Sequence, residues 1–281
     1  MRPLDEQTIL VTGATDGLGR ALAGDLAAAG AGVLVHGRDQ GRGRDTLDEI
    51  HARTPDARVR FLRADLASLA EVRALAAQAE RETGRLDALV NNAGIGTTTG
   101  GDERWEESRD GHELRFAVNY LSGYLLTRLL LPLLERSAPA RIVNVSSAGQ
   151  TAIDFDDVMI TRGYSGGRAY CQSKLAQVMF TFDLAEELDG RGVTATCLHP
   201  ATYMPTKMVI EAGTTPAGPL ERGLEATRRL VADRALDGVS GVYFNGLRQA
   251  EPDPQAHDVG ARRSLRALSD ELCGLGRSAV Y

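Results

Sequence analysis

Tyr170 and Lys174 are the two residues whose types and spacing most directly suggest chemistry. They lie four residues apart in a segment with a helical pattern, so their side chains are expected one turn apart on the same face. The pKa of an isolated tyrosine is about 10, too high for proton transfer near neutral pH, but a neighbouring ammonium favours the phenolate. The pair therefore predicts a proton donor for a carbonyl group that receives hydride.

Two serines strengthen this interpretation, because a Tyr-x-x-x-Lys spacing alone occurs by chance on many helices. Ser146 and Ser147 directly follow an apolar run at 141–145 that is typical of a strand. A serine hydroxyl at that end of a strand could hold the oxygen of the substrate.

A glycine-rich turn joins the first predicted strand to the first predicted helix, with the sequence TGATDGLG at 12–19. Glycines let the backbone turn sharply and approach a pyrophosphate, and the helix N-terminus offers free N–H groups and a partial positive charge. Such turns also occur for packing alone, but the flanking strand and helix favour a dinucleotide cofactor. The residues expected to contact it are Gly13, Thr15, Asp16, Gly17, Leu18 and Gly19.

The end of the second predicted strand bears on the choice of coenzyme. It carries His36, Gly37 and Arg38, where an acid would accept from the ribose 2′-OH of NAD. Gly37 leaves room for a phosphate and Arg38 offers a bidentate fork, so NADP(H) is preferred. Arg38 could equally be a solvated turn arginine, and Asp39 places an acid one residue further on, so NAD(H) stays possible.

Two other strand ends carry polar residues. Asp65 and Leu66 follow the third strand, where a short polar side chain could accept from the adenine amino group, although Asp65 could instead cap the next helix. Asn92, Ala93 and Gly94 follow the fourth strand, at the carboxyl edge where ligands lie in open α/β sheets.

Apolar runs alternate with segments of helical period along the chain. The predicted strands are 8–11, 32–35, 59–62, 86–90, 141–145, 193–198 and 241–244. The predicted helices are 18–29, 41–52, 69–82, 112–134, 169–188, 220–235 and 259–272. This alternation predicts one α/β domain over 1–281, a Rossmann-type doubly wound parallel sheet with helices on both faces.

Composition excludes several classes of function. The 281 residues carry a formal charge of −6, which argues against a nucleic-acid partner and against a surface for anionic lipid. The sequence offers no run of about 20 apolar residues, so no membrane insertion is expected. Cys171, Cys197 and Cys273 lack metal-ligand spacing, so we expect no metal and a cytoplasmic protein with reduced thiols.

In order along the chain, the motifs Thr-Gly-x-x-x-Gly-x-Gly, Asn-Asn-Ala-Gly, Ser and Tyr-x-x-x-Lys resemble those of the short-chain dehydrogenases/reductases. The resemblance covers nearly the whole chain. The segments 141–147, 169–176 and 198–200 are most similar to the branch of retinol dehydrogenases and WW-domain oxidoreductases.

That resemblance implies roles for individual residues. Tyr170 would be the general acid/base, Ser147 would orient the carbonyl, and Lys174 would lower the pKa of the tyrosine and hold the nicotinamide ribose. Asn119 would complete a proton relay through water. Pro200 and Thr202 would bind the cofactor, with Thr202 at the nicotinamide carboxamide, and Asn92 would lie beside the cofactor ribose. Members usually form dimers or tetramers through the helices that correspond to 113–134 and 169–188, so a homo-oligomer is expected.

We therefore expect an NADP(H)-dependent oxidoreductase acting on the carbonyl or secondary alcohol of a small molecule. The segment 201–235 reads as a substrate loop and helix. Its apolar residues either contact a lipophilic substrate or merely cover the edge of the sheet. They are Tyr203, Met204, Met208, Val209 and Ile210. Two alternatives stay open, a nucleotide-sensing regulator with little turnover and an epimerase or dehydratase of the same fold.

Overall fold

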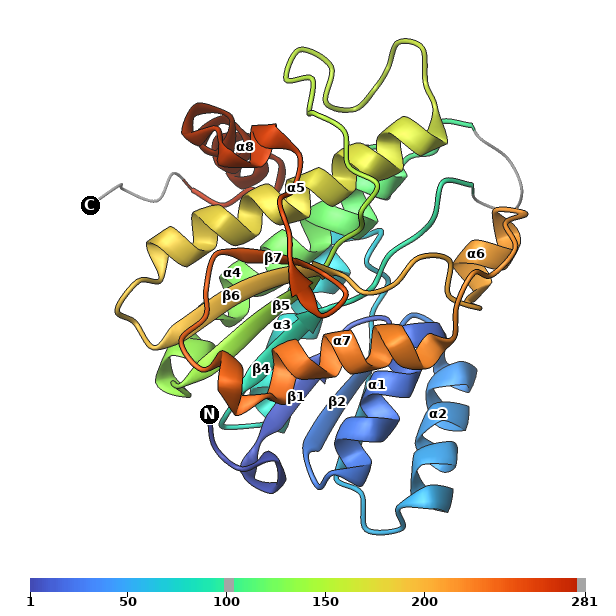
Figure 1. The fold of residues 1–281 in the computed structure, drawn as a ribbon, viewed down its shortest axis with the longest axis vertical. Coiled ribbons are helices and arrows are strands. Elements are labelled where there is room, and N and C mark those ends of the chain that lie inside the picture. Colours follow the sequence, from blue (N-terminus) through green and yellow to red (C-terminus); the bar gives the residue numbers. More distant parts are fainter. Residues whose placement is uncertain (99–103, 277–281) are drawn as a thin grey trace.

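The centre of the protein is an eight-stranded sheet, seen in a computed structural model that describes residues 1–98 and 104–276 (Figure 1). Seven strands are parallel, and the short last strand is antiparallel. In spatial order the strands are β3 (Val59–Arg63), β2 (Gly32–Gly37), β1 (Thr8–Val11), β4 (Ala88–Asn91), β5 (Ala140–Val145), β6 (Val193–His199), β7 (Val242–Asn245) and β8 (Arg248–Gln249). The chain reverses its direction of travel across the sheet between β1 and β4, where open α/β sheets bind ligands.

Helices cover both faces of the sheet, as expected for a doubly wound fold. One face packs against α1 (Gly17–Ala28), α2 (Gln40–Arg53) and α7 (Leu220–Ala232). The other packs against α3 (Leu69–Glu82), α4 (Ser122–Arg136) and α5 (Gly166–Glu187). Side chains of β1 alternate between these two cores, with Ile9 and Val11 on the α1 side and Leu10 on the α3 side.

The predicted helix 112–134 is the largest departure from expectation. A π-helical segment, Phe116–Leu121, precedes α4 and contains Asn119. One extra residue per turn rotates the side chains relative to a regular helix, which apolar periodicity does not predict. Smaller differences are that α5 begins at Gly166, that the predicted loop 201–220 contains the short helix α6 (Lys207–Glu211), and that β8 follows β7.

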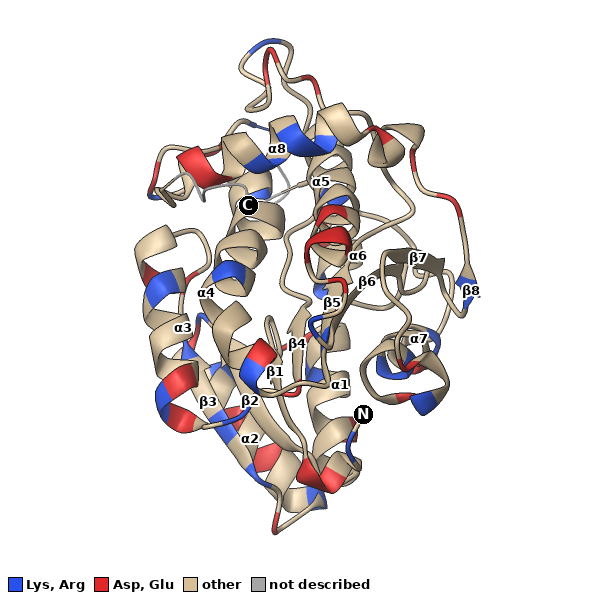
Figure 2. Cartoon of the chain, turned by 90° about the vertical axis from the view of Figure 1, so that its left-hand side faces the viewer, with Lys and Arg blue, Asp and Glu red and all other residues tan. Residues whose placement is uncertain are grey.

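The segment Phe116–Arg136 is, within the described part of the chain, the one helix long and apolar enough to cross a membrane. However, 72% of its apolar window is buried inside the protein, where it packs against α3 and α5. Helices in the core of globular proteins can have the same length and apolar composition. On the side of the molecule shown in Figure 2, acidic and basic residues are interspersed along α2 and α3.

The last helix, α8 (Val259–Leu272), packs against α5 and is tied to α4 and its π-helical start. The hydroxyl of Tyr120 lies 2.7 Å from Ser269 Oγ, and that of Tyr124 donates to Asp270 Oδ1 at 2.6 Å. Arg266 Nε donates to Asp183 Oδ2 of α5 at 2.6 Å. α8 thus covers part of the surface through which α4 and α5 are expected to pair with another subunit, and such pairing would have to form beside α8 or displace it.

We predict that Leu265→Ala destabilises the protein, because Leu265 is only 2% exposed where α8 meets the core. The lost contacts and the resulting cavity should lower the free energy of unfolding by about 2–5 kcal/mol, measured by urea denaturation. Val259→Ala, at a 46% exposed position of the same helix, is the control and should change it by less than about 0.5 kcal/mol. Equal effects of the two substitutions would contradict the docking of α8.

Candidate active site

The glycine-rich turn between β1 and α1 lies at the carboxyl edge of the sheet, and its path depends on missing side chains. Gly13 and Gly17 have φ values of +64° and +48°, in the region that favours glycine. A Cβ on Gly13 would lie 2.8 Å from Ala93 Cα, and one on Gly19 would collide with the carbonyl oxygen of Gly13. The turn therefore brings bare backbone and the N-terminus of α1 to the surface, which suits a pyrophosphate.

Thr12 and Asn92 hold this turn against the end of β4. Thr12 Oγ1 accepts from the backbone N–H groups of Asn92 and Ala93, both at 3.0 Å. In return, Asn92 Nδ2 donates to the carbonyl oxygen of Thr12 at 2.8 Å. The side chain of Asn92, expected beside the cofactor ribose, is thus engaged in bracing the turn.

His36 also holds the turn in place, a role that no sequence pattern predicts. Its Nδ1 accepts from Gly13 N at 3.1 Å, and its Nε2 lies 3.1 Å from the carbonyl oxygen of Ala64. A neutral ring with its hydrogen on Nε2 satisfies both contacts. Burial lowers the pKa of His36 to about 4, so the ring stays neutral at physiological pH.

Charged residues gather where α2 begins, next to the turn. Asp39 is the N-cap of α2 and accepts from Arg42 N at 2.8 Å, so its carboxylate is engaged. The guanidinium of Arg42 pairs with Asp16, whose Oδ1 also accepts from Gly17 N at 2.7 Å. Arg38 is exposed, and within the described residues it has no hydrogen-bond or ion-pair partner. One free arginine and one paired arginine thus lie near the predicted 2′-phosphate position.

Gly37 has a packing role that the sequence did not predict. A Cβ there would lie 2.5 Å from Thr15 Cγ2, so its missing side chain accommodates Thr15. Thr15 itself stays part of the turn.

The two residues expected near the adenine have largely structural contacts. Asp65 Oδ1 accepts from Ala67 N at 3.0 Å, and its other oxygen lies 3.6 Å from Arg109. Ser68, not Asp65, is the N-cap of α3. The side chain of Leu66 is buried in the core, which leaves its main chain as the part able to face a cofactor.

Ser147, Tyr170 and Lys174 come together above the end of β5, as predicted. Ser147 and Tyr170 lie side by side, since a Cβ on Gly149 would lie 3.5 Å from Ser147 Oγ and 3.9 Å from Tyr170 Cε1. Lys174 Nζ lies 5.6 Å from the centroid of the Tyr170 ring. Burial raises the pKa of Tyr170, and the neighbouring Ser147 hydroxyl opposes this shift. Tyr170 is therefore a neutral phenol that is able to donate a proton.

The neighbouring serine has a different place. Ser146 Oγ donates to the backbone carbonyl of Lys174 at 2.7 Å, which fixes α5 to the end of β5. Ser147 is thus the member of the pair that faces the tyrosine.

The ammonium of Lys174 is buried without a carboxylate partner among the described residues. Its Nζ donates to Val145 O and to Gln177 Oε1, both at 3.0 Å. Burial lowers the pKa of Lys174 to about 7.

Asn119 links the π-helical segment to the strand-end loop. Its Oδ1 accepts from Ile95 N at 2.8 Å, and its Nδ2 donates to Ile95 O at 3.2 Å and to Ser173 Oγ at 2.9 Å. A Cβ on Gly94 would lie 3.2 Å from Asn119 Oδ1 and 3.5 Å from Lys174 Nζ. The predicted members Gly94, Asn119 and Lys174 therefore meet at one point.

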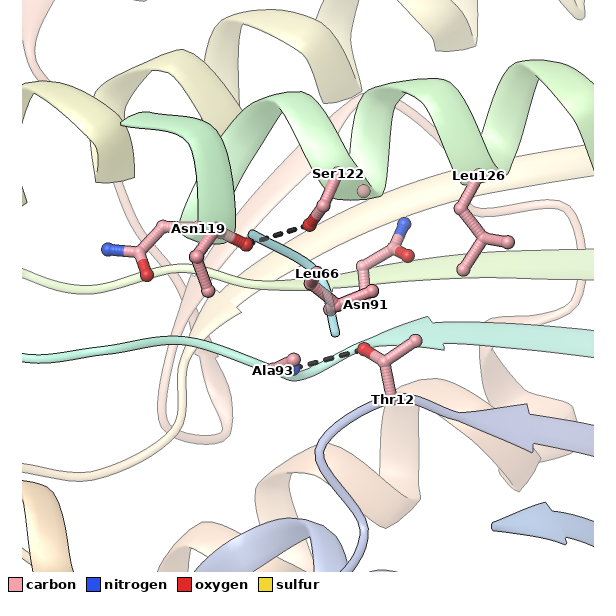
Figure 3. Close-up of a pocket in the computed structure, with 9 residues that line it drawn as sticks. Thr12, Leu66, Asn91, Ala93, Asn119, Ser122 and Leu126 are labelled. Carbon is pink, nitrogen blue, oxygen red and sulfur yellow. Dashed lines mark hydrogen bonds between the residues drawn. The ribbon is translucent and has the colours of Figure 1, made fainter. Parts of the chain in front are cut away.

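A small cavity separates this point from the glycine-rich turn (Figure 3). It has room for about one water molecule and is much too small for a cofactor or a substrate. Thr12, Asn91 and Ser122 lie around it, and the buried Oδ1 of Asn91 has no hydrogen-bond partner there. Among the described residues, no group of three potential metal ligands was found.

The segment after β6 passes over the site. Pro200 is buried, and the exposed Thr202 lies with its Oγ1 3.0 Å from His199 Nε2. Beyond it, α6 comes close to the loop after β4 and to the glycine-rich turn. A Cβ on Gly96 in that loop would contact Met208, and one on Gly17 in the turn would contact Thr206. This segment therefore reaches from the Lys174 end of the site to the pyrophosphate end.

Comparison with known proteins agrees with this geometry. The family model described as short chain dehydrogenase matches residues 7–217. The chain belongs to the short-chain dehydrogenase family. It is 39% identical to human retinol dehydrogenase 13 over 98% of this chain and 86% of the relative, and 41% identical to mouse retinol dehydrogenase 11 over 97% and 88%.

Solved structures of short-chain dehydrogenases and related proteins share the fold. An uncharacterised protein from Mycobacterium paratuberculosis superposes with a TM-score of 0.77 at 30% identity, covering 96% of this chain and 94% of the other. The complex of Pseudomonas aeruginosa RhlG with NADP has a TM-score of 0.68 at 28% identity, covering 87% and 97%. This short-chain dehydrogenase is accordingly an oxidoreductase for alcohol or carbonyl substrates that uses a nicotinamide dinucleotide.

We predict that His36 makes the stability of this short-chain dehydrogenase sensitive to acid. Its pKa is about 4 in the folded protein and 6.5 when unfolded, so the unfolded chain binds more protons between these values. The free energy of unfolding should therefore fall, by on the order of 3 kcal/mol, as the pH drops from about 6.5 to about 4.

The measurement is urea denaturation over this pH range, for the wild type and His36→Asn. The asparagine oxygen still accepts from Gly13 N but does not titrate, and the carboxylates titrate alike in both proteins. Parallel pH dependences for the two proteins would show that His36 is not responsible.

Proposed function

We propose that this short-chain dehydrogenase uses NADP(H) to interconvert a carbonyl and a secondary alcohol on a lipophilic small molecule, with Tyr170 as the acid/base. The observation that carries the proposal is the cluster of Ser147, Tyr170 and Lys174 at the sheet edge that also holds the glycine-rich turn. A regulator that only senses nucleotide would not need these three groups in contact.

The residues present fit a dinucleotide. At Gly13 and Gly19 a Cβ would collide with neighbouring backbone atoms, and α1 begins at Gly17, within this segment. Tyr170 and Lys174 would lie at the nicotinamide end, with Pro200 and Thr202 across from them. The cofactor supplies or accepts the hydride when bound. Asp65 and Leu66 would lie at the adenine end.

In the direction of reduction, the protein's own residues handle the substrate oxygen and the proton. Ser147 donates a hydrogen bond to the carbonyl oxygen and so fixes its position beside Tyr170. The Tyr170 hydroxyl, kept neutral by burial, gives its proton to that oxygen as negative charge develops there. The Lys174 ammonium next to the ring then stabilises the phenolate, and Asn119 would complete the path by which the proton is replaced.

Two arginines support the choice of NADP(H) over NAD(H). Arg38 is exposed and unpaired in the described structure, and Arg42 neutralises Asp16, the acid of the turn. A 2′-phosphate would find bidentate donors here, whereas Asp39, the acid nearest in sequence, already uses Oδ1 to cap α2.

The substrate class follows from the segment after β6. Tyr203 is 52% exposed and Ile210 63% exposed, which is unusual for large apolar side chains and suits contact with a lipophilic molecule. The relatives named retinol dehydrogenases point to substrates of the same kind. The cytoplasmic location and the homo-oligomer expected from the sequence stay predictions.

We predict that Tyr170→Phe lowers turnover by about 10²- to 10⁴-fold, because the proton donor is removed. The measurement is NADPH oxidation with a panel of lipophilic ketones, aldehydes including retinal, and quinones. The mutant should still bind NADPH, measured by fluorescence titration. Retained turnover would exclude Tyr170 as the acid, and no turnover by a wild type that binds NADPH would favour the nucleotide-sensing alternative.

We predict that Arg38→Asp reverses the coenzyme preference. Loss of a charged hydrogen bond to the 2′-phosphate should weaken NADPH binding by about 10- to 100-fold, while NADH binding changes little. The control is Arg44→Asp, which makes the same charge change at an exposed position within α2, after the turn that contains Arg38. Unchanged relative affinities in Arg38→Asp, or equal effects of both substitutions, would show that Arg38 does not read the phosphate.

A further inference from the structure

The ammonium of Lys174 is held by two neutral oxygens. Val145 O on β5 and Gln177 Oε1 on α5 each accept from Nζ at 3.0 Å, and Lys174 is only 3% exposed. Within residues 1–98 and 104–276, no carboxylate lies at ion-pair distance from Nζ. One of the two acceptors belongs to the backbone, so among the residues that the structure describes Gln177 is the one side chain that accepts from Nζ.

Gln177 lies three residues after Lys174, on the same side of α5, and is 4% exposed. Its turn of the helix is anchored to the sheet by a buried chain of hydrogen bonds. Thr181 Oγ1 donates to Gln177 O at 2.7 Å and accepts from Asn144 Nδ2 at 2.8 Å. Asn91 Nδ2 on β4 donates in turn to Asn144 Oδ1 at 2.8 Å. The backbone from which the Gln177 side chain extends is therefore fixed relative to the strands that end at the site.

We propose that Gln177 is a positioning residue for Lys174, whose amide oxygen orients Nζ toward Tyr170 and stabilises the charged ammonium. The catalytic part of this inference rests on the proposed function of Tyr170 and Lys174. The contact itself does not depend on that function.

The reason is the balance between burial and hydrogen bonding. Burial lowers the pKa of Lys174 to about 7, so both forms of the amine are populated near neutral pH. An acceptor that bonds to the charged form favours that form. The titratable groups that face Nζ are Tyr170 from α5 and His199 from β6, and neither is an anion at neutral pH. Gln177 thus supplies the partial negative charge that a carboxylate would otherwise provide.

The chain allows a direct test, because Lys174 and Lys207 are its only lysines. Protein labelled with ¹³C at lysine Cε should give two NMR signals, which Lys207→Arg assigns. Lys207 lies on α6 with an exposed side chain and serves as an internal control.

Three variants are compared with the wild type. Gln177→Met keeps the length but removes the acceptor, and Gln177→Asn is a milder change that shortens the reach of the amide. Both should lower the titration midpoint of Lys174 by about one pH unit or more, as expected for losing a hydrogen bond to a charged group. Gln177→Glu, which supplies a carboxylate, should raise it. A midpoint that stays at the wild-type value in all three variants would overturn the inference.

Turnover measured across pH separates this inference from the proposed function. We expect kcat to fall about 10-fold in Gln177→Met, with the pH profile shifted in the direction of the NMR midpoint and with KM for substrate little changed. Shifted NMR midpoints together with an unchanged pH profile would establish the contact and contradict the role of Lys174 in proton transfer.

Discussion

The close approach of the Gly13 backbone to the end of β4 is the constraint on which the rest of the site depends. No side chain fits between Gly13 and Ala93. Thr12 Oγ1 accepts from Ala93 N and Asn92 Nδ2 donates to Thr12 O, while His36 on β2 accepts from Gly13 N. These contacts position the N-terminus of α1 between the ends of β1 and β4, where the strand order of the sheet reverses. The loop that leaves β4 then runs directly to Asn119 and Lys174, so the same strand end positions the phosphate turn and the catalytic cluster.

Burial has opposite effects on the two titratable members of the cluster. It raises the pKa of Tyr170 and lowers that of Lys174, so it favours the neutral form of both. The protein counters this with neutral donors and acceptors, namely Ser147 for the tyrosine, and Val145 O and Gln177 for the lysine. Among the described residues no carboxylate pairs with Lys174, so no fixed negative charge beside it opposes the developing phenolate.

Much of the fold could be predicted from the sequence because buried parallel strands read as short apolar runs between helical segments. The Tyr170–Lys174 pair and the turn at 12–19 were predictable for a similar reason, since their function depends on spacing within one element. Long-range contacts were not predictable. Arg42 forms an ion pair with Asp16, and His36 accepts a hydrogen bond from Gly13 N. Both contacts join residues far apart in the sequence, so no local pattern predicts them. The π-helical turn at Asn119 was not predicted, because apolar periodicity does not distinguish a π turn from an α turn. The helix α6 was not predicted either, because a short exposed helix has little apolar periodicity.

The packing of α8 also has a consequence for how the protein is made. Tyr120, Tyr124 and Phe180 form an aromatic cluster, and the first two are bonded to Ser269 and Asp270, which come much later in the chain. During synthesis this surface emerges from the ribosome well before α8 does. Until α8 has been made, the hydroxyls of Tyr120 and Tyr124 lack these partners and the surface beneath α8 stays uncovered.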